Sequence, residues 1–194
     1  MFKFYKKIFF LLIFANFFFA CQPNKINEKI VFDLSSLDSI NINAEIKEIN
    51  NIYDILLAEP YIDHVMTITP SQRIESWFNN NIINFGSENK LVINLLDASI
   101  IRTEIKNKSK SNNLLNSEEY LYTIVILINY VLYDDSGSVL ATTEVKVERS
   151  TTSGKFISIN ERNDTLDQIT FEALRDCSKK SVELLKKHMI GYII

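Results

Sequence analysis

The chain has 194 residues, with 21 Lys and Arg against 24 Asp and Glu, and its formal net charge is −3. Residues 1–20 hold three lysines and no acidic residue, so a chain that begins at Cys21 carries 18 basic and 24 acidic side chains, a net charge of −6. This balance argues against a nucleic-acid-binding protein, which needs a concentrated basic face. About 175 residues are enough for one domain that buries roughly two thirds of its unfolded surface.

The amino terminus has the pattern of a secretory signal peptide. Three lysines within the first seven residues precede an apolar run from Ile8 to Ala15, which continues through three phenylalanines to Ala20. The apolar stretch of about 13 residues is shorter than the ~20 residues of a permanent transmembrane helix. We therefore predict that residues 1–20 direct export, in preference to the alternative of a buried core helix.

Cys21 follows this run directly and precedes a polar tether. Residues 1–25 resemble the signal of a bacterial lipoprotein, in which the cysteine is diacylated and becomes the new amino terminus. Phe18 and Phe19 depart from the residues usual in such signals, but Phe18 departs equally from an ordinary signal-peptidase site. The resemblance implies a lipid anchor on Cys21, and two acyl chains anchor a protein stably.

The residue after the cysteine bears on the destination of the protein. By the same resemblance, Gln22 in place of Asp implies the outer membrane more than the inner one, with the domain in the periplasm. The alternative is an unmodified Cys21 thiol, free or disulfide-bonded to Cys177, the only other cysteine. Acylation would leave Cys177 without an intramolecular partner.

We interpret residues 21–39 as a lipidated tether and residues 40–194 as a single domain. Apolar and polar residues alternate over 40–47, which predicts a half-buried strand. Residues 50–68 are ambiguous, although Val65–Ile68 resembles a short strand. Thr69, Pro70 and Gln72 form a capping box with proline at the first helical position, and apolar residues then recur at helical spacing. A helix over 70–84 follows, with Gly86 where it could end.

Three strands are expected next. Residues 90–105 are rich in Leu, Val and Ile, and a slip in their alternation near Leu95 predicts a bulge. Residues 119–133 are apolar on both faces, which predicts a central strand with cover on both sides. A tight turn at Asp134–Ser138 leads to an edge-like strand with one wet face that starts at Val139.

The last part of the chain predicts a long helix. Residues 150–163 have the composition of a polar loop, and Thr165 with Gln168 forms a second capping box. A helix over 165–189 follows, with an apolar stripe on one side that includes Cys177. The fold class is α+β, with an antiparallel or mixed sheet of about four strands packed by the two helices 70–84 and 165–189.

This element order supports a second, broader resemblance. A long hairpin with the turn Asp134–Ser138, a strand beginning Val139-Leu-Ala-Thr-Thr and a long closing amphipathic helix are similar to auxiliary lipoproteins of envelope ABC transport systems and of lipopolysaccharide assembly. Small uncharacterised lipoproteins share the pattern. The resemblance spans residues 40–190 and implies an accessory role in such a system.

Residues for enzyme chemistry are sparse. His64 and His188 are the only histidines, and four glycines leave no phosphate-binding loop. Glu59, Asp63 and His64 as metal ligands are weighed against a solvated turn, which we favour. Cys177 is interpreted as a small hydrophobe in a helix stripe. The chain is therefore predicted not to be an enzyme and to need no metal or cofactor.

The connection over 106–118 is the segment most open to a functional interpretation, because it is longer than a hairpin requires. Its candidate contacts to a partner or to a membrane are two leucines and three lysines: Leu114, Leu115, Lys106, Lys108 and Lys110. In the alternative, which we favour, the leucines fold back onto the sheet. The apolar stripe of the helix 70–84 is likewise interpreted first as core, and a ligand cleft is the minority interpretation.

Two functions follow as hypotheses. In the first, a lipid-anchored envelope protein uses its domain to dock onto a partner protein of an envelope transport or assembly system. In the second, the same domain carries a lipid or another apolar ligand between sheet and helices. Both include the membrane as a partner through Cys21, and neither includes nucleic acid.

Overall fold

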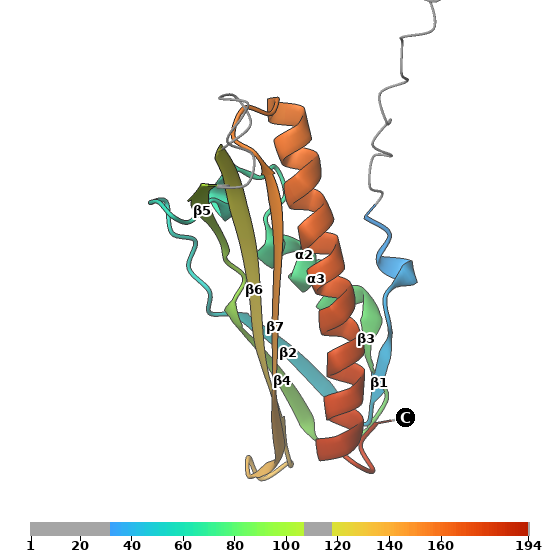
Figure 1. The fold of residues 1–194 in the computed structure, drawn as a ribbon. Coiled ribbons are helices and arrows are strands. Elements are labelled where there is room, and N and C mark those ends of the chain that lie inside the picture. Colours follow the sequence, from blue (N-terminus) through green and yellow to red (C-terminus); the bar gives the residue numbers. More distant parts are fainter. Residues whose placement is uncertain (1–31, 107–117, 194) are drawn as a thin grey trace, which may run out of the picture.

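The computed structural model describes residues 32–106 and 118–193 of the chain. These residues form two α-helices, two short 3-10 helices, a five-stranded sheet and a two-stranded sheet (Figure 1). In chain order the elements are η2 (Leu34–Ser36), β1 (Ile40–Ile42), β2 (Ile46–Asn51), η3 (Asp63–Val65), α2 (Pro70–Asn81), β3 (Ile82–Asn84), β4 (Lys90–Asp97), β5 (Ile100–Lys106), β6 (Glu118–Tyr133), β7 (Val139–Gly154) and α3 (Ile159–His188).

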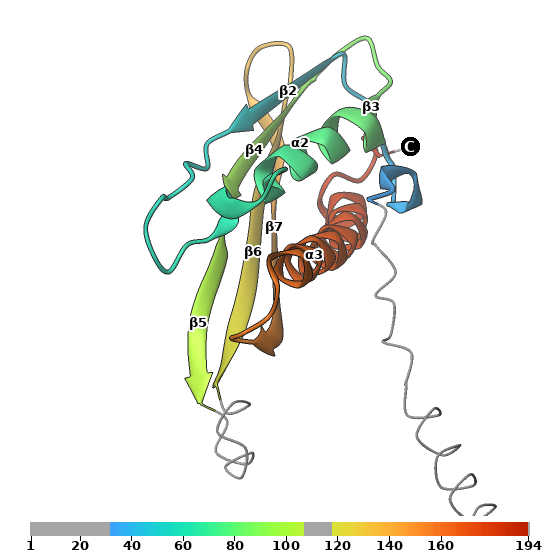
Figure 2. The same ribbon diagram turned by 90° about the horizontal axis from the view of Figure 1, so that it is seen from above.

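The strand β6 organises the main sheet. β7 pairs antiparallel with one edge of β6, while β4 and β5 pair antiparallel with successive parts of the other edge. β2 adds to β4 in parallel. Both helices lie on one face of this sheet (Figure 2). The predicted α+β class is thus confirmed, with a mixed sheet of five strands beside a small parallel pair of β1 and β3.

The central position of β6 is confirmed, but the expected cover on both of its faces is wrong. Even-numbered side chains from Tyr122 to Leu132 are buried under the helices. Odd-numbered side chains from Leu121 to Val131 stay half-buried, because both helices pack on the opposite face of the sheet (Figure 2). One-sided cover explains this difference between two faces of similar composition.

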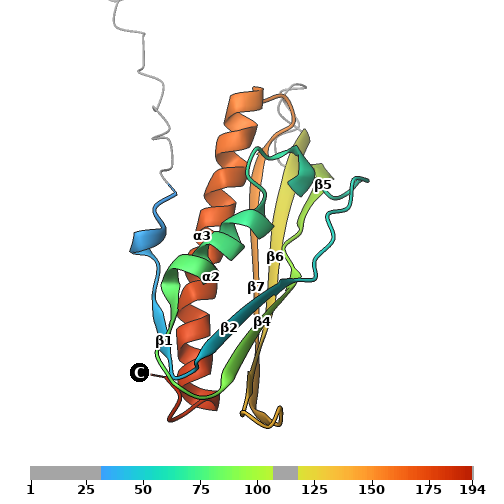
Figure 3. The ribbon, with the colours of Figure 1, turned by 180° about the vertical axis from the view of Figure 1, so that it is seen from behind.

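The single strand expected over 40–47 is two strands in two different sheets. β1 pairs with β3 beside the C-terminal half of α3 (Figures 1 and 3), and β2 pairs with β4 in the main sheet. Between them the backbone N–H of Asn43 donates to the Tyr192 carbonyl at 2.7 Å, so the chain changes partners here. Ile46, expected on the buried face, is consequently 52% exposed.

The bulge expected near Leu95 is confirmed, since the pairing with β6 shifts between Leu95 and Asp97. The expected strand 90–105 is nevertheless interrupted. Ala98 and Ser99 separate β4 from β5, and the Ser99 carbonyl accepts a hydrogen bond from the N–H of Val125 in β6 at 3.0 Å. β4 and β5 therefore share one edge of β6 as two strands.

The start of α2 is as predicted, but its end is not. The N–H of Gln72 donates to Thr69 Oγ1 at 3.3 Å, and the N–H of Thr69 donates to Gln72 Oε1 at 2.9 Å, which completes the capping box. The helix ends at Asn81 because Ile82–Asn84 pair with β1 as strand β3.

The prediction of a short strand at Val65–Ile68 is also wrong, because Val65 ends the 3-10 helix η3.

The prediction of a polar loop over residues 150–163 is also wrong. β7 continues to Gly154, opposite Glu119 of β6, and its polar alternation is that of an edge strand. The helix begins at Ile159, capped by Ser158 and Glu161 rather than by the predicted pair Thr165 and Gln168. Both sequences fit a capping box, and the earlier one is used because the strand ends just before it.

The space between sheet and helices is filled by large side chains. Trp77, Phe78, Tyr122 and Tyr130 are the largest fully buried side chains. Ile74, Trp77 and Phe78 all lie in this core, so the core interpretation of the α2 stripe is confirmed. Phe32 and the 3-10 helix η2 pack against the same core at the amino-terminal end of the described chain.

Gly86 marks a close approach between chain segments and supports a first prediction. A Cβ at this position would lie 2.6 Å from Asn43 Oδ1 and 2.8 Å from the backbone nitrogen of Ala44. The backbone cannot yield easily, so Gly86→Ala is expected to lower the free energy of unfolding by about 1–3 kcal/mol, measured by urea denaturation. Gly154→Ala is the control, because its Cβ would meet only Ile157 at 3.7 Å. Equal stability of the two variants would refute the clash.

Candidate functional site

Most of the residues singled out from the sequence as sites lie outside the described residues. These are Cys21, Lys108, Lys110, Leu114 and Leu115. Lys106 is the last residue of β5 and stands opposite Glu118 of β6 in the sheet register. The lipid anchor and the partner contact predicted for the 106–118 connection therefore stay predictions.

The other titratable candidates have local structural partners. Glu59 forms an ion pair with Arg102, while Asp63 is fully buried and accepts a hydrogen bond from the Tyr53 hydroxyl at 3.1 Å. His64, the next residue after Asp63, is exposed in η3. Within the described part of the chain, no three His, Cys, Asp or Glu side chains gather as metal ligands.

The Asp134–Ser138 segment is a tight turn, as predicted. Asp134 Oδ1 accepts hydrogen bonds from the backbone N–H groups of Ser136 and Ser138, at 2.9 and 2.8 Å. Gly137 supplies the positive φ of 84° that closes the turn. The carboxylate is thus engaged in the turn itself, which accounts for an aspartate at this position.

Cys177 is a fully buried free thiol on α3, as its place in the apolar stripe predicted. Burial raises its pKa from 9.0 to about 12, which lowers the thiolate fraction at pH 8 roughly a thousandfold. In the native protein at pH 8, iodoacetamide is therefore expected to leave Cys177 unmodified, as read by peptide mass spectrometry. Lys179→Cys, at an exposed position of the same helix, is the control and should alkylate readily. Rapid native alkylation of Cys177 would contradict its burial.

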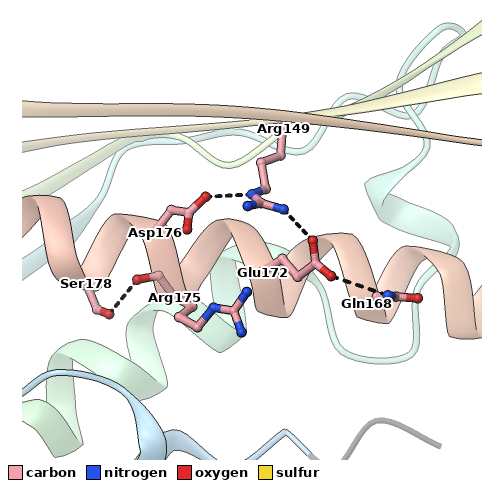
Figure 4. Close-up of polar contacts among 6 residues, drawn as sticks. All are labelled: Arg149, Gln168, Glu172, Arg175, Asp176 and Ser178. Carbon is pink, nitrogen blue, oxygen red and sulfur yellow. Dashed lines mark hydrogen bonds and ion pairs between the residues drawn. The ribbon is translucent and has the colours of Figure 1, made fainter. Parts of the chain in front are cut away.

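An ion cluster fastens α3 to β7 (Figure 4). Arg149 of β7 lies between two acidic side chains of α3, with its Nε 2.5 Å from Asp176 Oδ2 and its Nη1 paired with Glu172. Gln168 donates to the other oxygen of Glu172 at 3.3 Å. All charges of this cluster have partners, so we interpret it as a structural clamp between helix and sheet.

Buried polar atoms without partners lie elsewhere, on η3, α2 and the start of α3. Among the described residues, four buried side-chain atoms have no hydrogen-bond partner: Asp63 Oδ1, Arg73 Nε, Arg162 Nε and Asn163 Oδ1. Two of them, Arg73 Nε and Asn163 Oδ1, belong to side chains that line one cavity. Native proteins pair the great majority of such atoms, so two of them on the lining of one cavity call for an explanation.

The cavity between these segments is the candidate site, and we call it the α2–α3 cleft. Its volume is about 520 Å³. Its lining residues are Met66, Thr67, Ile68, Arg73, Asn160, Asn163, Asp164 and Asp167. The four residues from α3 recur at helical spacing, so they form one polar stripe over the first turns of the helix. The other lining residues come from the short connection after η3 and from the first turn of α2.

Arg73 is held in a fixed position in the wall of the cleft. Its side chain is only 12% exposed, and its Nη2 lies 2.6 Å from Asp167 Oδ1. The guanidinium also stands over the ring of Phe32, 3.6 Å from the ring centre. Burial lowers the pKa of Arg73 while Asp167 opposes that shift. The arginine is thus preorganised by an acid and an aromatic ring on two different segments.

Exposed apolar side chains occur in and near the chain segments that line the cleft, and we call them the apolar rim. They are Leu57, Val65, Ile68, Phe156 and Ile159, with exposed fractions of 79%, 40%, 47%, 74% and 69%. Leu57 and Val65 line a second cavity of about 150 Å³ that also includes Arg162, next to the cleft residue Asn163. Phe156 and Ile159 closely precede Asn160 in the chain. Exposed apolar groups and incompletely paired polar groups therefore occur in the same part of the chain.

The sequence did not predict this site. Its residues come from the connection 66–68, from α2 and from α3, which are distant in sequence. The signal that was present is the spacing of Asn160, Asn163, Asp164 and Asp167, which marks a polar helix face. Because the helix was expected to begin only at residue 165, three of the four stripe residues, Asn160, Asn163 and Asp164, were not seen as helical.

Among helices in the described residues, none is long and apolar enough to span a bilayer. No family model matches the chain, and no curated protein matches it. Solved structures do match. A minor lipoprotein from Acinetobacter baumannii is 9% identical with a TM-score of 0.41, covering 75% of this chain and 93% of its own. A Helicobacter pylori protein described as a homologue of a neuraminyllactose-binding hemagglutinin is 10% identical, with a TM-score of 0.36 and coverage of 82% and 96%.

A third match is a Xanthomonas campestris protein of the family DUF330, 12% identical with a TM-score of 0.30 and coverage of 78% and 92%. The chain is thus similar in fold, at low identity, to a bacterial lipoprotein and to these two proteins.

Proposed function

We propose that the protein is a lipid-anchored component of the bacterial cell envelope that docks onto a partner protein of a transport or assembly system. The anchor is the diacylated Cys21, which places the body in the periplasm, with the outer membrane preferred because Gln22 follows the cysteine. The proposal includes no catalytic step. Its support for docking comes from the surface at the start of α3.

One observation carries the docking function: the α2–α3 cleft and the apolar rim come from the same and neighbouring segments of the chain. Protein interfaces combine exposed apolar anchors with hydrogen-bonding groups that find partners on association. Here two exposed residues, Phe156 and Ile159, closely precede the cleft residue Asn160 in the chain, and two lining side chains of the cleft carry an unpaired polar atom. The opposite end of β7, at the turn Asp134–Ser138, is closed by its own hydrogen bonds.

The filled interior favours docking over carriage of an apolar ligand. A carrier needs an apolar cavity between sheet and helices, whereas Trp77, Tyr122 and Tyr130 fill that layer with no exposed fraction above 1%. Tyr130 also hydrogen-bonds Ser181 of α3 at 3.0 Å across the layer. Opening a ligand site there would break this packing.

Photo-crosslinking in intact cells tests the docking function. A benzoylphenylalanine at Ile159 or Ile68 of the full chain is expected to crosslink to a discrete envelope protein, identified by mass spectrometry. Val139, which is apolar and 57% exposed at the turn end of β7, is the matched control position. Crosslinks to one protein from the rim but not from Val139 support the proposal. The proposal would be overturned if Val139 crosslinked as strongly as Ile159 and Ile68, or if neither Ile159 nor Ile68 gave a crosslink.

A further inference from the structure

We infer that the α2–α3 cleft receives a basic side chain, carried on an extended segment of the partner protein. The inference rests on the proposed function, because it names the chemistry of the docking partner. It follows from the charge of the cleft, from its unpaired polar atoms and from the residues on its walls.

The charge of the cleft is negative. Asp164 and Asp167 stand against a single Arg73, and Asp164 forms no ion pair with any described residue. Acidic residues at a helix start are often explained by the helix dipole, but that effect falls off after the first turn. The acid of the first turn is Glu161, which belongs to the capping box. Asp164 lies beyond it, so the dipole does not account for its presence.

The unpaired polar atoms match the groups of a peptide with a basic side chain. A lysine ammonium has three donors, and the cleft lining carries the carboxylates of Asp164 and Asp167, of which one Asp167 oxygen is paired with Arg73. Arg73 Nε is a donor without a partner, and a backbone carbonyl of the same segment would serve it. Both unpaired atoms, Arg73 Nε and Asn163 Oδ1, belong to side chains on the cleft wall.

The apolar side of the cleft suits the stem of the basic residue. Met66 and Ile68 line the cleft together with the polar stripe, and Met66 is half-buried there. A thioether side chain adapts well to an aliphatic stem, and lysine and arginine stems pack on apolar surfaces while their charged ends reach polar groups.

Methionine NMR provides a site-specific test. The body has two methionines, Met66 in the cleft and Met189 buried at the far end of α3. The full chain, labelled with ¹³C-methyl methionine in detergent micelles, is titrated with acetyl-Gly-Lys-Gly-amide and separately with acetyl-Gly-Glu-Gly-amide. The lysine peptide is expected to shift the Met66 methyl signal saturably and leave that of Met189 in place. The glutamate peptide should shift neither signal.

Two variants locate the effect. Asp164→Asn keeps the shape of the side chain and removes its charge, and it should weaken binding of the lysine peptide about fivefold. Glu183→Gln, an exposed acid on the same helix away from the cleft, should leave binding unchanged. Equal responses to both peptides, no Met66 response, or equal effects of the two variants would overturn the inference. So would a Met66 shift produced only by phosphatidylethanolamine vesicles, which would assign the cleft to a lipid amine.

The two proposals fail separately. If Ile159 crosslinks to an envelope protein but the Met66 methyl signal does not respond to the lysine peptide, the docking function stands and the inference of a basic segment is refuted. A specific Met66 response without any crosslinked protein would retain the chemistry of the cleft and remove the proposed partner.

Discussion

Replacing Trp77 by alanine is expected to lower the free energy of unfolding by about 3–5 kcal/mol, which for a domain of this size lowers Tm by on the order of 10 °C. The indole is completely buried between α2 and the sheet. Its ring packs against Phe78 with centres 5.4 Å apart, and its Nε1–H donates to the Asp38 carbonyl at 3.3 Å. Alanine would leave a cavity and remove the hydrogen bond that joins the indole to the segment before β1.

The measurement is thermal unfolding of the full chain followed by far-UV circular dichroism, because the variant loses the single tryptophan. Trp77→Phe keeps part of the volume and is expected to fall between the wild type and the alanine variant. Asn80→Ala is the matched control, since Asn80 is exposed on the same helix and alanine favours helix. A loss below about 1 kcal/mol for Trp77→Ala would mean that α2 is not fixed to the sheet by this side chain.

This packing matters for the site as well as for stability. Arg73 lies one helical turn before Trp77, so the burial of the tryptophan sets where the guanidinium stands in the cleft. Asp167 and Phe32 then hold the arginine from the other side. The α2–α3 cleft therefore depends on the same core that supports the sheet.

Local patterns in the sequence predicted the parts of the fold that local interactions determine. Thr69 and Gln72 satisfy each other within four residues, so the start of α2 was visible without knowledge of the rest of the chain. The apolar run of β6 and the bulge at Leu95 were visible for the same reason. Features that depend on a partner distant in the chain were not visible in the sequence. The division between β1 and β2 follows from the contact of Asn43 with Tyr192, almost at the other end of the chain.

The candidate site shows the same limit. Its charges, Arg73 and Asp167, are 94 positions apart and meet only because α2 and α3 pack on one face of the sheet. A polar helix stripe such as Asn160 to Asp167 is ordinarily interpreted as a solvated surface, and sequence offers no way to see that a cavity lies beside it. The contacts predicted for Leu114 and Leu115 lie outside the described residues and remain a prediction.

Replacing Cys21 by serine is expected to abolish acylation and to release the protein from the membrane or leave it unprocessed, because serine has no thiol to carry the first lipid. Fractionation of cells into membrane and soluble pools, with intact-mass measurement of the purified chain, reads both effects. Cys177→Ser is the matched control and should stay in the membrane pool with its mass changed only by the substitution. Membrane attachment and lipid mass retained by Cys21→Ser would refute the anchor.

The same variant links the anchor to docking. Phe32 lies eleven positions after Cys21, a span of at most about 40 Å, so the proposed anchor would confine the body close to the bilayer. Confinement raises the effective concentration of the α2–α3 cleft near a partner in the same membrane. Photo-crosslinking from Ile159 is therefore expected to fall at least about tenfold in Cys21→Ser at equal protein level, while folding, read by thermal unfolding, stays unchanged. Undiminished crosslinking in the released chain would mean that the partner is not confined to that membrane.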